Sequence, residues 1–486
     1  MALRTMQKFV SRGFKWFFPE PEKAEDGRDQ WPSRAAFLLA AMGGCAGQGN
    51  LLRYPSVVYN NYGLQWFIPY MLAVFLIAIP ALVLEISIGQ CYRGGSVIAF
   101  NNINRRLKGV GIGPVFKHSN AVMDAVLICG SNVLFENFAA FAIFGVVGFL
   151  RRWPSPDERL GAFVVGFLTL PEAVLQTPGA NFWAVLLFLT LIVLGFSSAF
   201  VMLDVVATLL VDSGFRYSRP VIVSGLTLAS FLMCLPYCTE FGYYLLDGVD
   251  RWINNIALIF VVFSEVVSAT TVYRWTDVVG QVGMPAFVIY NLGYFGGLLI
   301  GITVAHGVES AAIGAGAGFG VFTVCTILAG IVASSPSPSN TALPSRIRAQ
   351  LAQLWYLAFY SGNQLRRDLN LIVGSGNNWK IPAFMPVLLR YVSGPVLAII
   401  FSFAFPEFHE LRYDPMMIAG FILSILGMVG VLLGFVVPRY YDCFVPWQRR
   451  EEGMKETLLD RPVEQGDAVS VGSEDGGESG REKIGG

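Results

Sequence analysis

Long runs of apolar residues divide this chain, and most of them are about as long as one membrane-spanning helix. Crossing ~30 Å of hydrocarbon takes roughly 20 mostly apolar residues in helical form. Runs that meet this condition lie near residues 35–58, 64–91, 122–150, 180–211, 219–237, 241–271, 283–305, 313–334, 382–405 and 416–438. Because the runs are continuously apolar and do not alternate, they favour helices over a β-barrel. The pattern predicts an all-α membrane protein with about ten transmembrane helices.

The composition agrees with this fold class. Of the 486 residues, 54% are hydrophobic and 14% are charged, which is too apolar for a soluble globule of this length. The formal net charge is zero, so charge gives no indication of a nucleic-acid partner. The three histidines are isolated and lack metal-ligand spacing. Membrane lipid is therefore the first partner that the sequence predicts, and neither nucleic-acid binding nor enzymatic activity is expected.

Basic residues beside the first two runs indicate how the chain is oriented. Arg4 and Lys8 precede the first run, and Arg105 and Lys108 follow the second. Loops rich in lysine and arginine face the cytoplasm. Ten spans return the chain to the side on which it began. We therefore expect a multi-pass integral membrane protein whose N and C termini are both cytoplasmic.

Both ends of the chain are polar. Residues 1–30 mix basic and aromatic side chains, which suits a membrane surface and predicts a cytoplasmic N-terminal segment. Residues 449–486 are acidic and rich in glycine and serine, and are too polar to bury a core. They are predicted to form a disordered cytoplasmic tail. Residues 31–448 between them are predicted to form the transmembrane helical domain.

The first apolar run is interrupted by Gly-Gly-Cys-Ala-Gly-Gln-Gly-Asn at residues 43–50. Each glycine costs roughly 1 kcal/mol relative to alanine in a helix interior. Unpaired backbone in hydrocarbon costs more, so such a break is tolerated where it lines a cavity or is buried in protein. The segment predicts a broken helix whose free carbonyls and amides can hold an ion or a carboxylate. The alternative is a continuous helix in which Gly43 and Gly47, four residues apart, form a packing face.

Residues 31–90, which run from WPSRAAFLL to LEISIGQ, resemble the first two helices of the neurotransmitter:sodium symporters. Residues 124–149 resemble that family's seventh helix, residues 180–211 its eighth, and residues 219–271 its ninth and tenth. The resemblance implies part of an inverted-repeat transporter fold with a broken first helix. It also implies co-transported Na⁺, no organic cofactor, and a plasma-membrane location.

The same resemblance implies residues for two sodium sites and a substrate site. Na⁺ is a hard cation, and carbonyl, hydroxyl and amide oxygens supply its ligands without further charge. The implied sodium ligands are Gly43, Cys45, Ala46, Asn50, Asn132, Ser197 and Ser198. The implied substrate-binding residues are Gly44, Cys45, Gly47, Gln48 and Gly49. Serine and asparagine in membrane helices also commonly bond to a neighbouring helix, and this alternative stays open for each of them.

Two positions indicate the substrate class and the ion dependence within this resemblance. Gly47 stands where monoamine carriers of the family have an aspartate and amino-acid carriers a glycine, which implies a small amino acid as substrate. Glu136 lies one helical turn after Asn132, where chloride-dependent members have a serine. Its own charge, with Tyr70 beside it, implies that transport does not require chloride.

Arg53 and Asp250 match the residues that form the family's outer gate, an ion pair that closes over bound substrate. The alternatives are an arginine whose head group reaches the membrane surface and an aspartate that favours a helix start. These alternatives stay open on sequence grounds.

The chain also departs from the family. Residues 109–116 resemble the threshold of the third helix, yet the segment that follows resembles the approach to the seventh, so helices three to six lack a counterpart. Residues 283–334 and 382–438 each supply a pair of spans where the family has one pair, and either pair fits. The expected function is sodium-coupled symport of a small amino acid or related neurotransmitter-like solute. The alternative is a truncated membrane relative that does not transport, from a splice variant or an incomplete gene model, and an oligomer that completes the cavity is a further possibility.

Overall fold

The computed structural model describes residues 22–23, 29–30, 34–61, 63–92, 96–110, 120–151, 160–213, 217–334, 345–374 and 378–445. The predicted tail at 449–486, most of the predicted N-terminal segment and the junction before residue 120 lie outside these ranges. Within residues 22–30, β1 (Glu22–Lys23) and β2 (Asp29–Gln30) form a short antiparallel pair, which the hydropathy pattern did not predict. The rest of the described regular structure is helical, as the pattern predicts.

The first half of the described chain contains the broken helix, two long helices and several short ones. In chain order the α-helices are α2 (Arg34–Cys45), α3 (Tyr54–Asn60), α4 (Leu64–Ala73), α5 (Ile79–Tyr92), α6 (Ser96–Ile103), α7 (Ala121–Phe149), α8 (Ala162–Val164), α9 (Leu170–Leu175), α10 (Ala180–Asp212), α11 (Arg219–Cys234) and α12 (Gly242–Trp252). Short π-helical segments join several of them, at Gly49–Arg53, Val74–Ala78, Val165–Thr169 and Ile253–Leu258, and 3₁₀ turns lie at Arg105–Val110 and Leu235–Cys238.

The second half continues with a helical hairpin and a second pair of long helices. Its α-helices are α13 (Ile259–Val267), α14 (Trp275–Val282), α15 (Met284–Val308), α16 (Ala311–Val332), α17 (Ser345–Trp355), α18 (Ser361–Val373), α19 (Met385–Leu388), α20 (Gly394–Leu411) and α21 (Pro415–Val436). Further π-helical segments lie at Ser268–Val272, Tyr356–Tyr360 and Leu389–Ser393, and a 3₁₀ helix lies at Pro438–Phe444.

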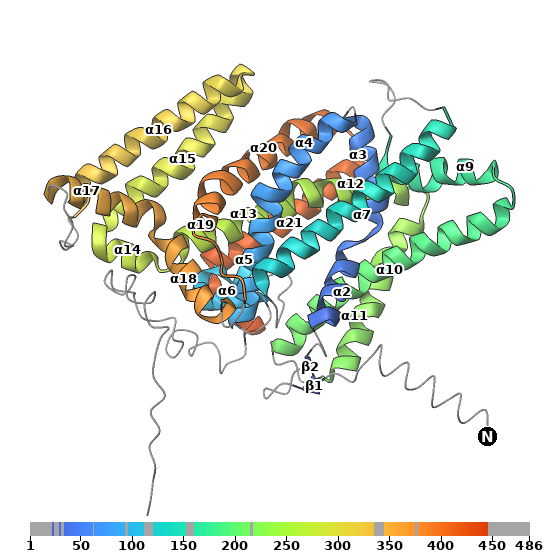
Figure 1. The fold of residues 1–486 in the computed structure, drawn as a ribbon, viewed down its shortest axis with the longest axis horizontal. Coiled ribbons are helices and arrows are strands. Elements are labelled where there is room, and N and C mark those ends of the chain that lie inside the picture. The colour runs from blue at the N-terminus through green and yellow to red at the C-terminus, as the bar shows by residue number, and fades with distance from the viewer. Residues whose placement is uncertain are drawn as a thin grey trace, which may run out of the picture.

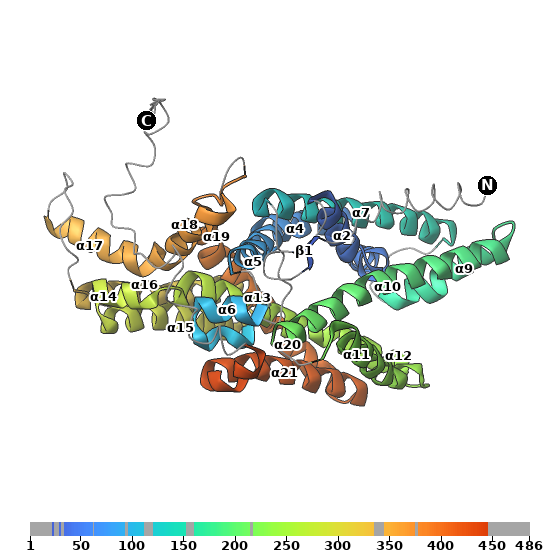
Figure 2. The ribbon, with the colours of Figure 1, turned by 90° about the horizontal axis from the view of Figure 1, so that it is seen from below.

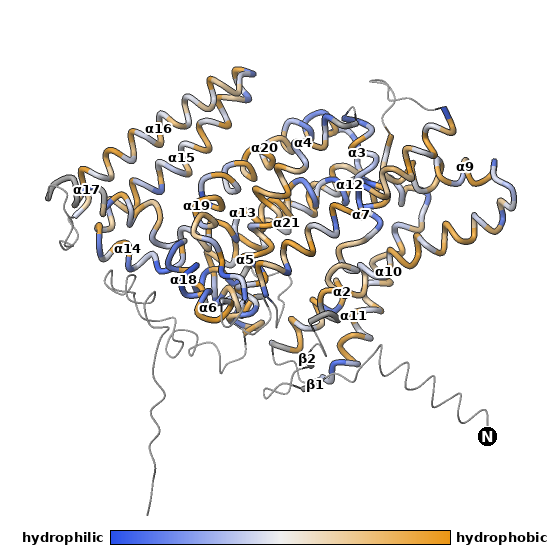
Figure 3. Tube along the Cα trace, in the orientation of Figure 1, coloured by the Kyte–Doolittle hydropathy of each residue, from blue (hydrophilic) through white to orange (hydrophobic). Residues whose placement is uncertain are grey.

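Nine helices in the described part of the chain are long and apolar enough to cross a membrane, against the ten runs predicted. The missing one is the first run, because it is broken between α2 and α3 and no continuous helix spans it. The other nine runs each match a span, and Figure 3 shows the long helices as predominantly hydrophobic along their length. The protein is an integral, multi-pass, all-α membrane protein.

Two groups of helices lie at opposite ends of the molecule. The hairpin of α15 and α16 lies at one end and α9 with the start of α10 at the other, in both views (Figures 1 and 2). The turn of the hairpin contains Glu309 in the left-handed region at φ 55°, and the Ser310 side chain caps α16. The pair α20 and α21 packs on α12 and α13 in the middle of the molecule. The hairpin contacts that middle through α20 and through the Leu389–Ser393 segment before it.

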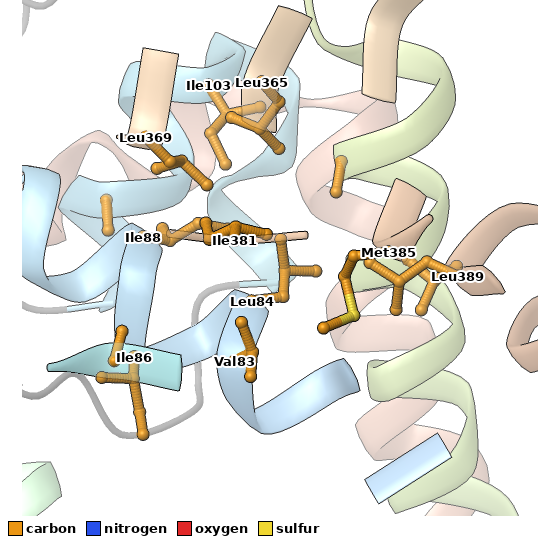
Figure 4. Packing of buried hydrophobic residues seen from close by; sticks show 14 of the residues in the cluster. Val83, Leu84, Ile86, Ile88, Ile103, Leu365, Leu369, Ile381, Met385 and Leu389 are labelled. Atoms are coloured by element: carbon orange, nitrogen blue, oxygen red, sulfur yellow. The ribbon is translucent and has the colours of Figure 1, made fainter. Parts of the chain in front are cut away.

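The largest buried cluster lies where α5, α6, α13 and α18 meet the short helix α19 (Figure 4). Ile86 is 0% exposed and Val83 is 1% exposed on α5, and Leu365 and Leu369 approach from α18. Aliphatic side chains on four helices fill one volume, and their packing holds α5 in place. Because α5 continues the helix that follows the broken one, this cluster provides the fixed frame for the polar groups described next.

Candidate functional site

The first helix is broken, as the glycine-rich segment predicts. Helix α2 ends at Cys45, residues 46–47 are not helical, and a π-helical turn resumes at Gly49. The Ala46 N–H donates to the Met42 carbonyl at 2.9 Å, which closes the last turn of α2. The last carbonyls of a helix have no partner within that helix. The carbonyls of Gly43, Cys45 and Ala46, the predicted sodium ligands, therefore lie at a helix end.

Asn50 and Asn132 meet, although 82 residues separate them in the chain. The Asn50 Nδ2 donates to Asn132 Oδ1 at 2.6 Å, and the Asn50 side chain is buried at 8% exposure. Asn120 caps α7, where its side chain accepts from the Met123 N–H, and α7 then carries Asn132 to the depth of the break. The two predicted side-chain ligands of the first sodium site thus lie side by side.

The polar contacts continue along α7. The Asn132 side chain also hydrogen-bonds Glu136, one turn further on. The Tyr70 hydroxyl donates to Glu136 Oε2 from α4, as the resemblance implies for this pair. The rings of Tyr54 and Tyr70 lie 4.9 Å apart, centroid to centroid. Asn50, Asn132, Glu136 and Tyr70 therefore form one connected polar chain between the break, α7 and α4.

Helix α10 closes on the break from the other side. A Cβ placed on Gly47 would lie 2.8 Å from Ser198 Oγ, so the Ser198 hydroxyl sits directly against the non-helical segment. Ser197 instead donates to the Leu194 carbonyl of its own helix at 2.9 Å. That bond leaves the lone pairs of the Ser197 oxygen as acceptors. Of the two predicted serines, Ser198 therefore lies against the break, and Ser197 is bonded within α10.

Some residues of the predicted substrate-binding segment contact α10, and others face open space. Gln48 Nε2 donates to the Leu191 carbonyl of α10 at 2.8 Å, so this amide holds α10 to the break. A Cβ on Gly44 would lie 3.2 Å from Val201, whereas one on Gly49 would meet open space. Gly195 was not predicted, yet a Cβ there would lie 3.1 Å from the Gln48 amide nitrogen. No spacing rule in the sequence links Gly195 to Gln48, because their contact depends on how two separate helices cross.

The predicted outer gate forms an ion pair. Arg53 Nη1 lies 3.1 Å from Asp250 Oδ2, and the two side chains are 38% and 41% exposed. Asn254 was not predicted, but its Nδ2 donates to Asp250 Oδ1 at 3.0 Å and to the Asp250 carbonyl at 2.6 Å. Its position four residues after Asp250 on the same helix is a signal that the sequence does contain. The predicted gate residues therefore form a partly exposed ion pair with one supporting amide.

Other buried polar groups lie outside the predicted set. Tyr54 donates to Asn137 Oδ1 at 3.3 Å beside the Glu136 contact. The carboxyl groups of Glu85 on α5 and Glu265 on α13 lie close enough to interact, with Glu265 at 2% exposure. Two carboxyl groups buried inside neighbouring spans are an expensive arrangement, because charge is strongly disfavoured within a bilayer.

A broken first helix, a polar chain to α7, and the Ser198 hydroxyl of α10 against the break together resemble the arrangement that discontinuous helices form in secondary transporters. The profile of the Sodium:neurotransmitter symporter family matches residues 28–117 and 115–292. These segments cover more than half of the chain, and the chain belongs to this family. The two matched segments meet at residues 115–117.

Individual relatives match shorter stretches. The human sodium- and chloride-dependent neutral and basic amino acid transporter B(0+) is 28% identical over 185 residues, 37% of this chain and 27% of that protein. Glycine transporter 2 of Xenopus laevis is 28% identical over 162 residues, 32% of this chain and 20% of that protein. The rat sodium-dependent neutral amino acid transporter B(0)AT1 is 39% identical over 97 residues, which cover 20% of this chain and 15% of that protein. The chain spans about a quarter or less of the length of these relatives in the matched regions.

Proposed function

We propose that this protein is a sodium-coupled secondary active symporter of a small amino acid. The observation that carries the proposal is the contact of Asn50 with Asn132 beside the broken end of α2, at 2.6 Å. Amide oxygens and helix-end carbonyls within one small volume are the donors that a hard cation prefers. An ion held there would bridge α2, α3 and α7. Its binding would therefore favour one arrangement of these helices over another, which is the physical basis of coupling.

The proposed second sodium site lies where α10 meets the break. The carbonyls of Gly43 and Ala46 come from the end of α2, and the hydroxyls of Ser197 and Ser198 come from α10. Gly47 lets the Ser198 hydroxyl approach the break, since any side chain there would collide with it, and open space beside Gly43 and Gly49 is where a substrate carboxylate would be placed. The relatives that carry neutral or basic amino acids, or glycine, agree with this substrate class.

Uptake of a mixed radiolabelled amino-acid pool into proteoliposomes tests the proposal. We expect uptake that requires an inward sodium gradient and that Asn50→Ala abolishes. Asn61→Ala is the matched control, because Asn61 is exposed at the end of α3 and bonds only within its own turn. Sodium-independent uptake, or equal uptake by both variants, would contradict the proposal.

Chloride independence forms part of the proposal, although the human and Xenopus relatives are named as chloride-dependent. An ionised Glu136, one helical turn after Asn132, would supply a negative charge in place of chloride. We expect uptake to persist when gluconate replaces chloride, and Glu136→Ser to make uptake depend on chloride. Chloride-insensitive uptake by the serine variant would show that Glu136 has another role.

The proposed orientation places both termini in the cytoplasm of a cell whose plasma membrane holds the protein. The basic residues around α2 and after α5 support it through the positive-inside rule. Reaction of single introduced cysteines with a membrane-impermeant thiol reagent measures it. Labelling of the N terminus in intact cells would reverse the assignment.

A second candidate function is that of a membrane relative that does not transport. The observation that favours it is the meeting of the two matched family segments at residues 115–117, together with the short coverage of each relative. Helices three to six would carry part of the substrate cavity, and a chain without them would keep insertion but lose alternating access. Well-inserted protein that shows no uptake under any ion condition would support this candidate.

A further inference from the structure

A cavity of about 530 Å³ lies between α15, α16 and α20, far from the proposed sodium sites. All three helices belong to candidate membrane spans, so the medium around the cavity is lipid. Its walls are aromatic and aliphatic side chains, among them Tyr294, Phe319 and Phe322. Water would gain few hydrogen bonds from such walls. An apolar molecule of the bilayer is the occupant that the walls favour.

The walls are held in place by contacts around Arg390. This residue is 4% exposed, and its guanidinium donates to the Thr270 carbonyl at 3.0 Å and to Asn291 Oδ1 at 3.1 Å. The same guanidinium lies 5.5–5.7 Å from the ring centroids of three tyrosines, on α15 and beside α20. Tyr294 in turn donates to the Arg390 carbonyl. Because α15 is bonded to the segment before α20 in this way, the cavity is formed before any occupant enters.

Glycines let α15 and α16 approach each other closely along one wall. A Cβ on Gly301 would lie 3.0 Å from the Gly314 carbonyl oxygen, and one on Gly297 would lie 2.8 Å from the Gly318 carbonyl oxygen. Small residues at such positions let two helix backbones pack in the membrane. The cavity wall formed by α15 and α16 carries these glycines together with Leu298, Ile302, Phe319 and Phe322. The close approach of the two backbones makes this wall continuous and apolar.

Three polar side chains of the cavity lie at the end nearest the turn between α15 and α16, whereas the hydroxyls of Tyr294 and Tyr391 are bonded to the backbone carbonyls of Arg390 and Ala358. His306 Nε2 and Ser402 Oγ are hydrogen-bonded at 2.9 Å, and the His306 ring packs on the edge of Phe403. Glu309, in the turn itself, lines the same end. Helix α15 has 25 residues, roughly 37 Å of helix, so His306 near its last turn lies close to the membrane surface. The occupant therefore has its polar head at the surface and its apolar body toward the bilayer centre.

The charges at this end decide the kind of head group. The residues that line the cavity, all in the described part of the chain, include Glu309 but neither lysine nor arginine. A carboxylate or phosphate head would meet a like charge without a cationic partner, which disfavours fatty acids and phospholipids. A neutral hydroxyl both donates and accepts, and can bond to His306 and Ser402.

We infer that this cavity binds a sterol, with its hydroxyl at His306 and Ser402 and its ring system against the apolar wall of α15 and α16. The volume is in the range of sites for small rigid molecules, roughly 300–1,000 Å³, and is small for a lipid with two chains. Among neutral single-hydroxyl amphiphiles, a rigid ring system loses less conformational entropy on binding than a flexible chain.

Photolabelling of protein made in a sterol-free bacterial host tests this inference. The full chain is placed in phosphatidylcholine nanodiscs with a cholesterol analogue that carries a diazirine, and labelled peptides are mapped by mass spectrometry. We expect saturable labelling of α15, α16 or α20 that excess cholesterol removes and an equal amount of monoacylglycerol does not. Non-saturable labelling, or equal competition by monoacylglycerol, would overturn the sterol assignment.

Two variants of α16 locate the site. Ala315 lines the cavity, and Ala315→Trp is expected to reduce labelling at least tenfold by filling the space. Ile313 lies on the opposite side of α16 and is 54% exposed, so Ile313→Trp should label like the native protein. Ser402→Ala should weaken labelling about threefold to tenfold, through loss of one hydrogen bond. Equal labelling of the two tryptophan variants, with matching thermal unfolding, would show that the cavity is not the site.

Discussion

The two sides of the helix bundle differ in how they are packed. On one side, which we call the frame, α5, α13, α18 and α20 bury aliphatic side chains around Ile86 and Leu369. On the other, which we call the site side, α3, the outer part of α7 and α10 hold the polar contacts of Asn50, Glu136 and Ser198. In the most apolar stretch of the Gly242–Val272 span, 44% of residues are buried. In the most apolar stretch of α10, the buried share is 6%.

This difference in packing suggests that the frame determines the stability of the protein, whereas the site side holds the proposed functional contacts. Buried side chains on several helices lose their contacts together when one is removed, so the frame resists change. The site side has fewer such contacts, and its helices meet through single polar pairs. The proposed transport would need helices that move relative to a fixed part. We therefore expect changes to the frame to lower stability and changes to the site side to leave stability largely unaltered.

The largest expected effect comes from shortening a core side chain of the frame. Ile86 is 0% exposed, and Ile86→Ala should lower the free energy of unfolding by about 3 kcal/mol, because the cavity it leaves cannot be filled by rigid neighbours. Ile68→Ala on α4 is the matched control, since Ile68 is 67% exposed. Thermal unfolding in detergent micelles measures both. Similar losses in the two variants would remove the distinction between frame and surface.

The next largest effect concerns the ion pair that joins Lys108 to Asp442. Lys108 is 1% exposed, so Asp442→Asn leaves a buried charge without its partner and should destabilise the protein by about 3 kcal/mol. Burial raises the pKa of Asp442, but the hydrogen bond and charge of Lys108 together with Arg105 lower it overall. The native carboxylate therefore stabilises the fold above its unfolded pKa, and this stability is lost as pH falls through the lowered folded pKa. Adding Lys108→Met to Asp442→Asn should restore most of the loss, and a double variant as unstable as the single one would contradict this account.

Asp368 should give stability a pH dependence of the opposite sign. It is 2% exposed and accepts hydrogen bonds from Tyr273 at 2.6 Å and Gln364 at 2.9 Å, yet burial raises its pKa to about 6. The folded state therefore binds more protons than the unfolded state between about pH 4 and 6, and stability falls as pH rises through this window.

The measurement is the stability of the native protein minus that of Asp368→Asn, from pH 4 to pH 7. We expect the difference to fall by roughly 2 kcal/mol over this range and to be level above it. Asp277→Asn, which removes a neighbouring carboxylate and leaves Asp368 in place, serves as the control. Parallel curves for the native protein and the Asp368 variant would rule out titration of this carboxyl group.

The smallest effect is expected on the site side, at the gate. Arg53 and Asp250 are each more than a third exposed, and such pairs contribute roughly 0.2–1 kcal/mol. Arg53→Ala should therefore change the free energy of unfolding by less than about 1 kcal/mol. The comparison between the two sides would fail if this variant were as unstable as Ile86→Ala.

Several features of this protein are local properties of its sequence. The spans follow from the length and hydropathy of single segments, and the break follows from four glycines in seven residues, so both could be predicted. Resemblance to a family further predicted that Asn50 meets Asn132 and that Arg53 meets Asp250, and the structure places both pairs in contact.

Other features depended on the tertiary structure alone. The contact of Gln48 with the Leu191 carbonyl, the burial of Lys108, and the cavity with His306 and Ser402 each join segments far apart in the chain. Helices that are apolar around their whole circumference carry no periodic signal for the face that packs. Sequence therefore determined which segments enter the membrane and where the first of them breaks, whereas the crossing of whole helices decided which side chains meet.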